Sequence, residues 1–145
     1  MPQPNYSRLE PRHCFVTIIS DSDATGETSE RRSMSDWQEA EQRVEKAHEL
    51  YEGGNWEAAL KELRAAIEIN PNNSSWYFNL GLTLDMMERY EEALKAYTQA
   101  LRMDPHDTEV LHAAGVDATR LGRYKCSIDL FKRLERLDPT YQACY

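Results

Sequence analysis

The sequence predicts an all-α protein, built as a right-handed superhelical stack of three two-helix units. Many positions after residue 34 repeat at a period of 34, which the prolines Pro71, Pro105 and Pro139 mark, each directly after an Asn or Asp. Between the prolines, apolar residues recur at intervals of three and four, as the buried face of an α-helix requires. A fixed period of this length indicates a helical repeat architecture.

Residues 1–34 are expected to form a disordered N-terminal tail. They carry three prolines, scattered charge and a polar run over residues 20–29, and such a segment cannot bury enough apolar surface to offset its ordering entropy. An alternative is an upstream mis-called start, with translation beginning at Met34.

Six helices are expected over residues 36–52, 56–69, 74–87, 90–103, 108–121 and 124–137, which group into repeats of about 35–73, 74–107 and 108–141. Each second helix ends before a proline, because proline disfavours helical geometry in the residue before it. Side-chain oxygens predict the helix starts: Ser35 with Gln38 as a capping box, then Asn73 or Ser74, and Asp107 or Thr108.

Residues of similar size recur at equivalent positions of the three units. Ala47, Gly81 and Gly115 are predicted to lie where paired helices approach closely, opposite the small residues Ala59, Ala93 and Ser127. The aromatic residues Trp56, Tyr90 and Tyr124 follow each inter-helix turn and are predicted to wedge into the seam between units. Residues 142–145 read as the start of a further helix.

Charge, cysteine content and the motifs of the sequence exclude several classes of function. The formal net charge of −8 disfavours both nucleic acid and an anionic membrane as partners. No apolar stretch before residue 34 is long enough for a signal peptide or a membrane span. Three cysteines, widely spaced and odd in number, favour a reducing, cytoplasmic location. The histidines lack metal-ligand spacing, and no phosphate-binding loop or nucleophile motif occurs, so we expect no metal, no cofactor and no enzyme activity.

The repeat resembles the tetratricopeptide repeat family. The segment Trp76-Tyr-Phe-Asn-Leu-Gly, followed by Tyr90-Glu-Glu-Ala-Leu-Lys-Ala-Tyr and ending in Asp104-Pro105, is close to the family consensus. The resemblance covers residues 35–141 and implies a module that binds protein or peptide. The resemblance indicates the fold but does not identify the biological process, because members of the family serve many processes.

In this family, partners usually lie in a concave groove formed by the first helix of each unit. Carried over by register, ten residues are the candidate partner-binding site: Val44, His48, Tyr51, Phe78, Leu82, Asp85, Met86, His112, Val116 and Arg120. Glu41, Ser75, Glu109 and Thr119 share the same register. Phe78 and Leu82 are expected to form an exposed apolar stripe, which usually marks a binding site; the alternative is that both simply fill a narrow groove.

One subgroup of the family holds acidic chaperone C-termini with a clamp of lysine, arginine and asparagine side chains. The matching positions here are Val44, His48, Asn79, Glu109 and Ala113, of which only the asparagine fits. Carboxylates bound there would lack cationic partners and Glu109 would repel them, so the resemblance implies no such clamp.

The leading interpretation is therefore a protein-interaction adaptor or co-chaperone-like scaffold that binds a peptide or helix in an apolar groove. Two alternatives are a regulatory or scaffolding domain truncated from a larger enzyme or longer repeat array, and a secretion-type chaperone for hydrophobic proteins. Apolar residues of helix 124–137 that would meet a fourth repeat are expected to be bare, which leaves room for self-association through this uncapped end. The net charge of the three units runs from −5 through −3 to +1.

Overall fold

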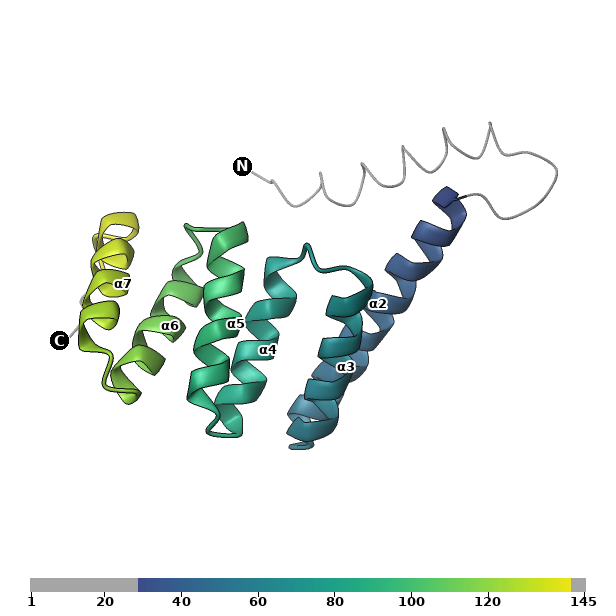
Figure 1. Ribbon diagram of the computed structural model, residues 1–145, viewed down its shortest axis with the longest axis horizontal. Helices are drawn as coiled ribbons and strands as arrows, with labels where there is room; N and C mark the ends of the chain where they lie inside the picture. The colour runs from purple at the N-terminus through teal and green to yellow at the C-terminus, as the bar shows by residue number, and fades with distance from the viewer. Residues whose placement is uncertain (1–28, 142–145) are drawn as a thin grey trace. The chain divides into compact units, whose positions relative to one another are not determined.

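The computed structural model describes residues 29–141, and within this range all regular structure is α-helical (Figure 1). The helices there are α2 (Ser29–Glu52), α3 (Trp56–Ile69), α4 (Ser74–Met86), α5 (Tyr90–Met103), α6 (Thr108–Arg120) and α7 (Tyr124–Leu137). The chain divides into two units at residues 39 and 40, inside α2. Of the first unit, residues 29–39 are described, and they are helical.

Residues 40–141 confirm the predicted all-α stack of helix pairs. Helix α4 packs against α5 and α6 against α7 within repeats, while α3 packs on α4 and α5 on α6 between repeats. The largest buried cluster contains Leu84, Tyr97, Leu111 and Leu134, one from each of the last four helices. Neighbouring repeats therefore share one continuous core, as repeat stacks require.

The second helix of each repeat ends just before the proline that was expected to stop it. The residues before Pro71, Pro105 and Pro139 are in extended conformation, with φ of −135°, −130° and −131°. Steric conflict with the following proline ring favours that geometry and stops each helix at the same register. The predicted bounds of α3, α5 and α7 are confirmed to the residue.

The first helices follow the prediction less closely. Asn73 and Asp107 accept hydrogen bonds from the second and third backbone amides beyond them, so they are the N-caps of α4 and α6. Helix α2 begins at Ser29 instead of residue 36, so the expected capping box at Ser35 is wrong: Ser35 lies inside the helix. Residues 29–34, which the sequence assigned to the tail, are helical, whereas residues 1–28 and 142–145 lie outside the described range.

The predicted close approach of paired helices occurs at the glycines, but different side chains fill it. A Cβ atom at Gly81 would lie 2.3 Å from Cε1 of Tyr97, and one at Gly115 would lie 2.7 Å from Cζ of Phe131. Aromatic rings, rather than the small residues expected there, thus lie nearest to both glycines. Ser127 still contacts this junction, because its hydroxyl donates to the Gly115 carbonyl at 3.0 Å.

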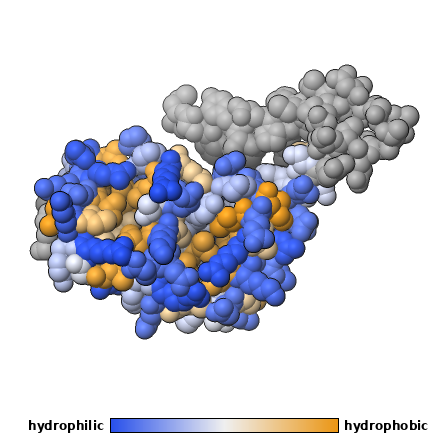
Figure 2. Space-filling model, viewed as in Figure 1, coloured by the Kyte–Doolittle hydropathy of each residue, from blue (hydrophilic) through white to orange (hydrophobic). Residues whose placement is uncertain are grey.

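The prediction for the aromatic residues after each turn is wrong at its last member. Tyr124 is 65% exposed, and Ile128 and Leu137 on the same helix are 39% and 40% exposed. Helix α7 therefore leaves apolar side chains bare, as expected. On the face drawn in Figure 2, apolar residues lie in patches between hydrophilic ones. Within residues 29–141, no helix combines the length and the apolar character that crossing a bilayer requires.

Candidate functional site: the groove lined by α2, α4 and α6

The structure places four of the ten candidate residues around one cavity between α2 and α4. Val44, His48 and Tyr51 line it from α2 and Leu82 from α4, and its volume is about 130 Å³. Asn79, Thr83, Ala47 and Leu63 complete the lining. The register that predicted these residues from separate repeats therefore brings them together at one place.

The wall of this cavity is mainly apolar with one amide. The buried Thr83 donates its hydroxyl hydrogen to the Asn79 carbonyl at 2.8 Å, which satisfies the hydroxyl inside its own helix. His48 lies at the rim, where its Nε2 is 3.3 Å from Glu52 and its side chain is 70% exposed. The Asn79 amide is consequently the polar group of the lining best suited to bond a ligand backbone.

Phe78 is less exposed than the sequence suggested. It is half-buried against the main core, and its ring centroid lies 5.9 Å from that of Tyr97. Leu82 and Val116 are also half-buried, while Met86 is 45% exposed. The apolar stripe is thus partly inserted into the core, and its open portion lies at the cavity and at Met86.

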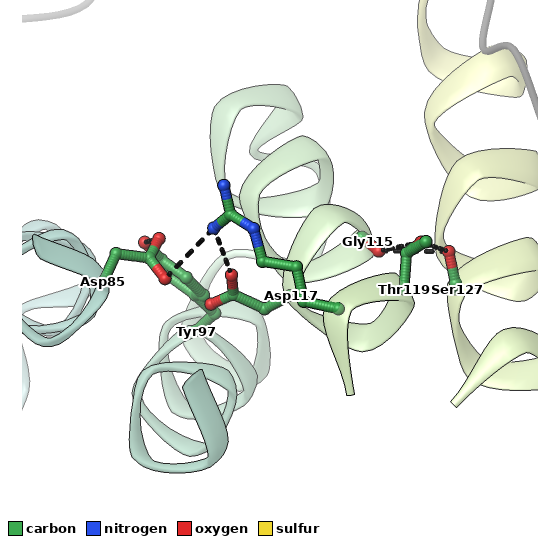
Figure 3. Close-up of polar contacts among 7 residues, drawn as sticks. Asp85, Tyr97, Gly115, Asp117, Thr119 and Ser127 are labelled. Carbon is green, nitrogen blue, oxygen red and sulfur yellow. Dashed lines mark hydrogen bonds and ion pairs between the residues drawn. The ribbon is translucent and has the colours of Figure 1, made fainter. Parts of the chain in front are cut away.

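A polar cluster joins α4 to α6 farther along these helices, and it contains two of the candidate residues, Asp85 and Arg120. The Tyr97 hydroxyl donates to Asp85 Oδ2 at 2.7 Å, and Arg120 Nη1 donates to Asp117 Oδ1 at 3.1 Å. The same Arg120 nitrogen lies 3.7 Å from Asp85 Oδ1, and its guanidinium covers the Tyr90 ring at 4.8 Å. Figure 3 shows the carboxyl groups of Asp85 and Asp117 pointing toward each other from α4 and α6.

The second oxygens of this pair explain its protonation. Asp85 Oδ1 and Asp117 Oδ2 are buried and accept no hydrogen bond from the described residues, while one guanidinium lies beside both carboxyl groups. Burial, and then the hydrogen bond and charge of Asp85, raise the pKa of Asp117 from 3.8 to about 7, against the opposing effect of Arg120. A proton on the Asp117 carboxyl can be shared with Asp85 as a hydrogen bond, which is one cause of the raised pKa of Asp117. Burial and Asp85 also raise the pKa of Tyr97, which stays a donor.

Sequence reasoning missed Asp117. It occupies the position 34 residues after Thr83, which faces inward, and no local pattern distinguishes a buried aspartate there from an exposed one. On α6, the exposed candidate residue His112 lies edge-on to Tyr141 with ring centroids 5.6 Å apart, and Tyr141 stacks on Phe131 at 6.4 Å.

The five positions that match the carboxylate clamp do not form one cluster of cationic side chains in the structure. Val44, His48 and Asn79 surround the cavity, whereas Glu109 is exposed at the start of α6 and Ala113 is half-buried. No group of three metal-binding side chains occurs in the described part of the chain.

Solved structures and sequence families agree on the fold. An Arabidopsis OM64 tetratricopeptide repeat domain is similar at a TM-score of 0.68 and 23% identity, covering 74% of this chain and 88% of that one. The second such domain of Spaghetti (RPAP3), bound to the HSP90 peptide SRMEEVD, has a TM-score of 0.68 and 21% identity over 74% and 99%. A chain of the CopN-Scc3 complex has a TM-score of 0.67 and 20% identity, covering 70% of this chain and 60% of that one.

At these identities the likeness to solved structures shows the fold alone. No curated protein sequence matches the chain significantly. The family model for the tetratricopeptide repeat, however, matches residues 44–108 and 84–141, which together span most of the chain. The chain therefore belongs to the tetratricopeptide repeat family.

Proposed function

We propose that the chain is a protein-interaction module that holds an extended or helical segment of a partner in the groove lined by α2, α4 and α6. The observation that carries this proposal is the cavity of about 130 Å³ between α2 and α4. Small-molecule sites usually measure about 300–1,000 Å³, so this cavity has room for one side chain rather than for a metabolite.

The residues that line the cavity indicate which kind of partner side chain fits there. Val44, Tyr51 and Leu82 offer apolar contacts, and Asn79 offers an amide next to them. An aliphatic side chain of the partner would bury its surface in the cavity while its backbone bonds the amide. This supports an adaptor or scaffold role, without catalysis, and the cysteine content supports a cytoplasmic location.

The groove is also unlike one that holds an acidic C-terminus. The five positions that match the clamp carry no lysine or arginine. Glu109, which is one of them, is negatively charged and exposed. Carboxylates of a peptide such as SRMEEVD, which the Spaghetti domain binds, would be desolvated here without cationic partners. We therefore propose a partner segment whose anchor is aliphatic and whose terminal carboxylate plays no part.

The test is selection from a phage-displayed peptide library, followed by affinity measurement on the selected peptides. Aliphatic residues should be enriched, and Leu82→Ser should weaken binding about tenfold, since that corresponds to ~1.4 kcal/mol of lost contact. The control is Ile128→Ser, which removes an exposed apolar side chain from α7 instead. Circular dichroism and thermal unfolding establish that both variants remain folded.

Two results would overturn the proposal. One is an equal loss of affinity in Ile128→Ser, which would place the peptide away from the groove. The other is tight binding of SRMEEVD by the unmodified chain. Glu109→Lys should instead be needed before that peptide gains measurable affinity, because it replaces a repelling charge by an attracting one.

A further inference from the structure

A second hollow lies away from the groove, between the second helices α5 and α7. Its volume is about 560 Å³, and its charged side chains are Lys95, Arg102, Arg123 and Arg133. None of the described residues that line it is acidic, although the whole chain carries a net charge of −8. The α5–α7 hollow is thus a basic surface on an acidic protein.

Two of the four cations of the α5–α7 hollow are held without being neutralised. Arg102 Nη1 donates to Gln99 Oε1 at 3.2 Å, and Arg133 Nη2 donates to the Pro105 carbonyl at 3.0 Å, so both guanidiniums bond neutral oxygens. Within residues 29–141, Arg123 is the one of the three arginines that pairs with a carboxylate, that of Glu91. Neutral hydrogen bonds orient a guanidinium while leaving its charge available for a carboxylate ligand.

The equivalent surface of the first repeat shows that this charge pattern is not a property of the repeat. Behind α3, a hollow of about 440 Å³ is lined by Glu57 and Glu68 as well as Lys61 and Arg64. Lys61 precedes Lys95 by one period, and Glu68 occupies the position that Arg102 takes one period later. The same backbone position therefore carries opposite charges in the two repeats.

The floor of the α5–α7 hollow is apolar. Leu94, Leu101 and Leu130 line it and are 6–8% exposed, and the exposed Cys126 lies beside them. A ligand that fits this lining presents carboxylates to the rim and an apolar side chain to the floor. A polypeptide offers both, whereas a nucleic acid offers phosphates but no aliphatic group, and the acidic remainder of the chain would repel it.

We propose that the α5–α7 hollow is a second docking surface that takes an acidic segment of a partner protein. Carboxylates of that segment pair with Lys95, Arg102 and Arg133, and an aliphatic side chain covers the leucine floor. The two surfaces lie on different helices, the groove on α2, α4 and α6 and this one on α5 and α7. The module can thereby hold two protein segments at once.

The experiment is fluorescence anisotropy of a labelled peptide that repeats Glu-Glu-Leu-Asp, titrated with the full chain at low and at physiological salt. Lys95→Glu combined with Arg102→Glu should weaken binding at least about tenfold, and added salt should weaken binding by the unmodified chain. Lys61→Glu combined with Arg64→Glu is the matched control, because it makes the same charge change on the equivalent face of α3. That control and the groove variant Leu82→Ser should both retain the affinity.

Five results would overturn the proposal. Equal binding of a Gln-Gln-Leu-Asn peptide would show that charge plays no role, and an equal loss in the Lys61→Glu, Arg64→Glu control would show only a general charge effect. Loss in Leu82→Ser would place the peptide in the groove. Stronger binding of single-stranded RNA at the same residues would make the surface a nucleic-acid site, and a dimer that Lys95→Glu with Arg102→Glu dissociates would show that a second copy occupies it.

Discussion

Asp117 is a single residue whose protonation couples pH to stability. The pKa of its folded form is about 7, above the ordinary value of 3.8, because burial and Asp85 disfavour its charge. Between these two values the folded chain keeps a proton that the unfolded chain releases, so raising the pH favours the unfolded chain. The contribution of Asp117 is complete below about pH 4, falls as the pH rises toward 7, and is constant above that.

The variant Asp117→Asn should remove this dependence, because its amide donates to Asp85 at every pH. The free energy of unfolding of the variant, minus that of the unmodified chain, should rise between pH 4 and 7 by at most about 1.4 kcal/mol per pH unit. Urea unfolding at several pH values measures this difference. Asp129→Asn removes an exposed carboxylate instead and serves as the control. A difference for Asp117→Asn that stays constant with pH would contradict the shared proton.

Gly81 is the second residue with a large expected effect. A methyl group there would meet the Tyr97 ring at 2.3 Å, and that ring is fully buried and held by Asp85. Gly81→Ala should therefore destabilise the fold by about 1–3 kcal/mol through overpacking. Gly53→Ala is the matched change, since a Cβ there meets its nearest atom at 3.4 Å. Equal midpoints of chemical unfolding for the two variants would show that the helix pair can separate without cost.

At the scale of elements, the turns inside the repeats share one conformation but not one residue. Gly54, Glu88 and Gly122 follow each other by 34 residues and all have positive φ, of 79°, 58° and 72°. Each turn is closed by the next residue, whose amide bonds a carbonyl five positions earlier at 2.8–2.9 Å. Glu88 is the member that pays a steric penalty, because only glycine adopts this region freely.

Replacing Glu88 by Gly should then stabilise the chain by a few tenths to about 1 kcal/mol, the steric relief being partly offset by greater unfolded-state entropy. The reciprocal change Gly122→Ala should destabilise it by about 1 kcal/mol, although nothing lies within 4 Å of the added methyl. Thermal unfolding of both variants tests the pair. Opposite signs are required; a loss in Glu88→Gly would mean that this side chain makes a contact worth more than the strain.

The same elements show what can be predicted from a sequence of this kind. Prolines fixed the ends of α3, α5 and α7 because their effect is local and steric, and asparagine or aspartate fixed the starts of α4 and α6. The start of α2 could not be predicted, because a serine such as Ser35 can either cap a helix or lie inside one. The cavity residues Val44, His48 and Leu82 followed from register. The Asp85–Asp117 pairing could not, because it joins different register positions of successive repeats, and a repeat period relates only equivalent positions.

At the scale of the whole molecule, stability should vary along the stack. Helix α5 packs against both α4 and α6 and buries six residues, while α7 packs against α6 and buries three, Ser127, Leu130 and Leu134. In a repeat stack, each helix is stabilised mainly by its nearest neighbours, so a helix with bare apolar residues opens at lower free energy. The hydrogen bonds of the Ser127 hydroxyl with the Gly115 carbonyl and with the Thr119 hydroxyl hold α7 to α6, but among the described residues they do not replace a second packed helix.

Native-state hydrogen exchange should therefore show stronger protection in α5 than in α7. Equivalent amides make the comparison direct, since Leu94 and Ile128 occupy the same position in successive repeats and both lie in the first turns of their helices. Exchange of Ile128 should be the faster of the two after correction for intrinsic rates. Denaturant should convert α5 to exchange by global unfolding at a concentration where α7 still exchanges by local opening. Equal protection of the two amides at every concentration would mean that the stack opens only as a whole, and that the apolar residues left bare on α7 do not weaken the third repeat.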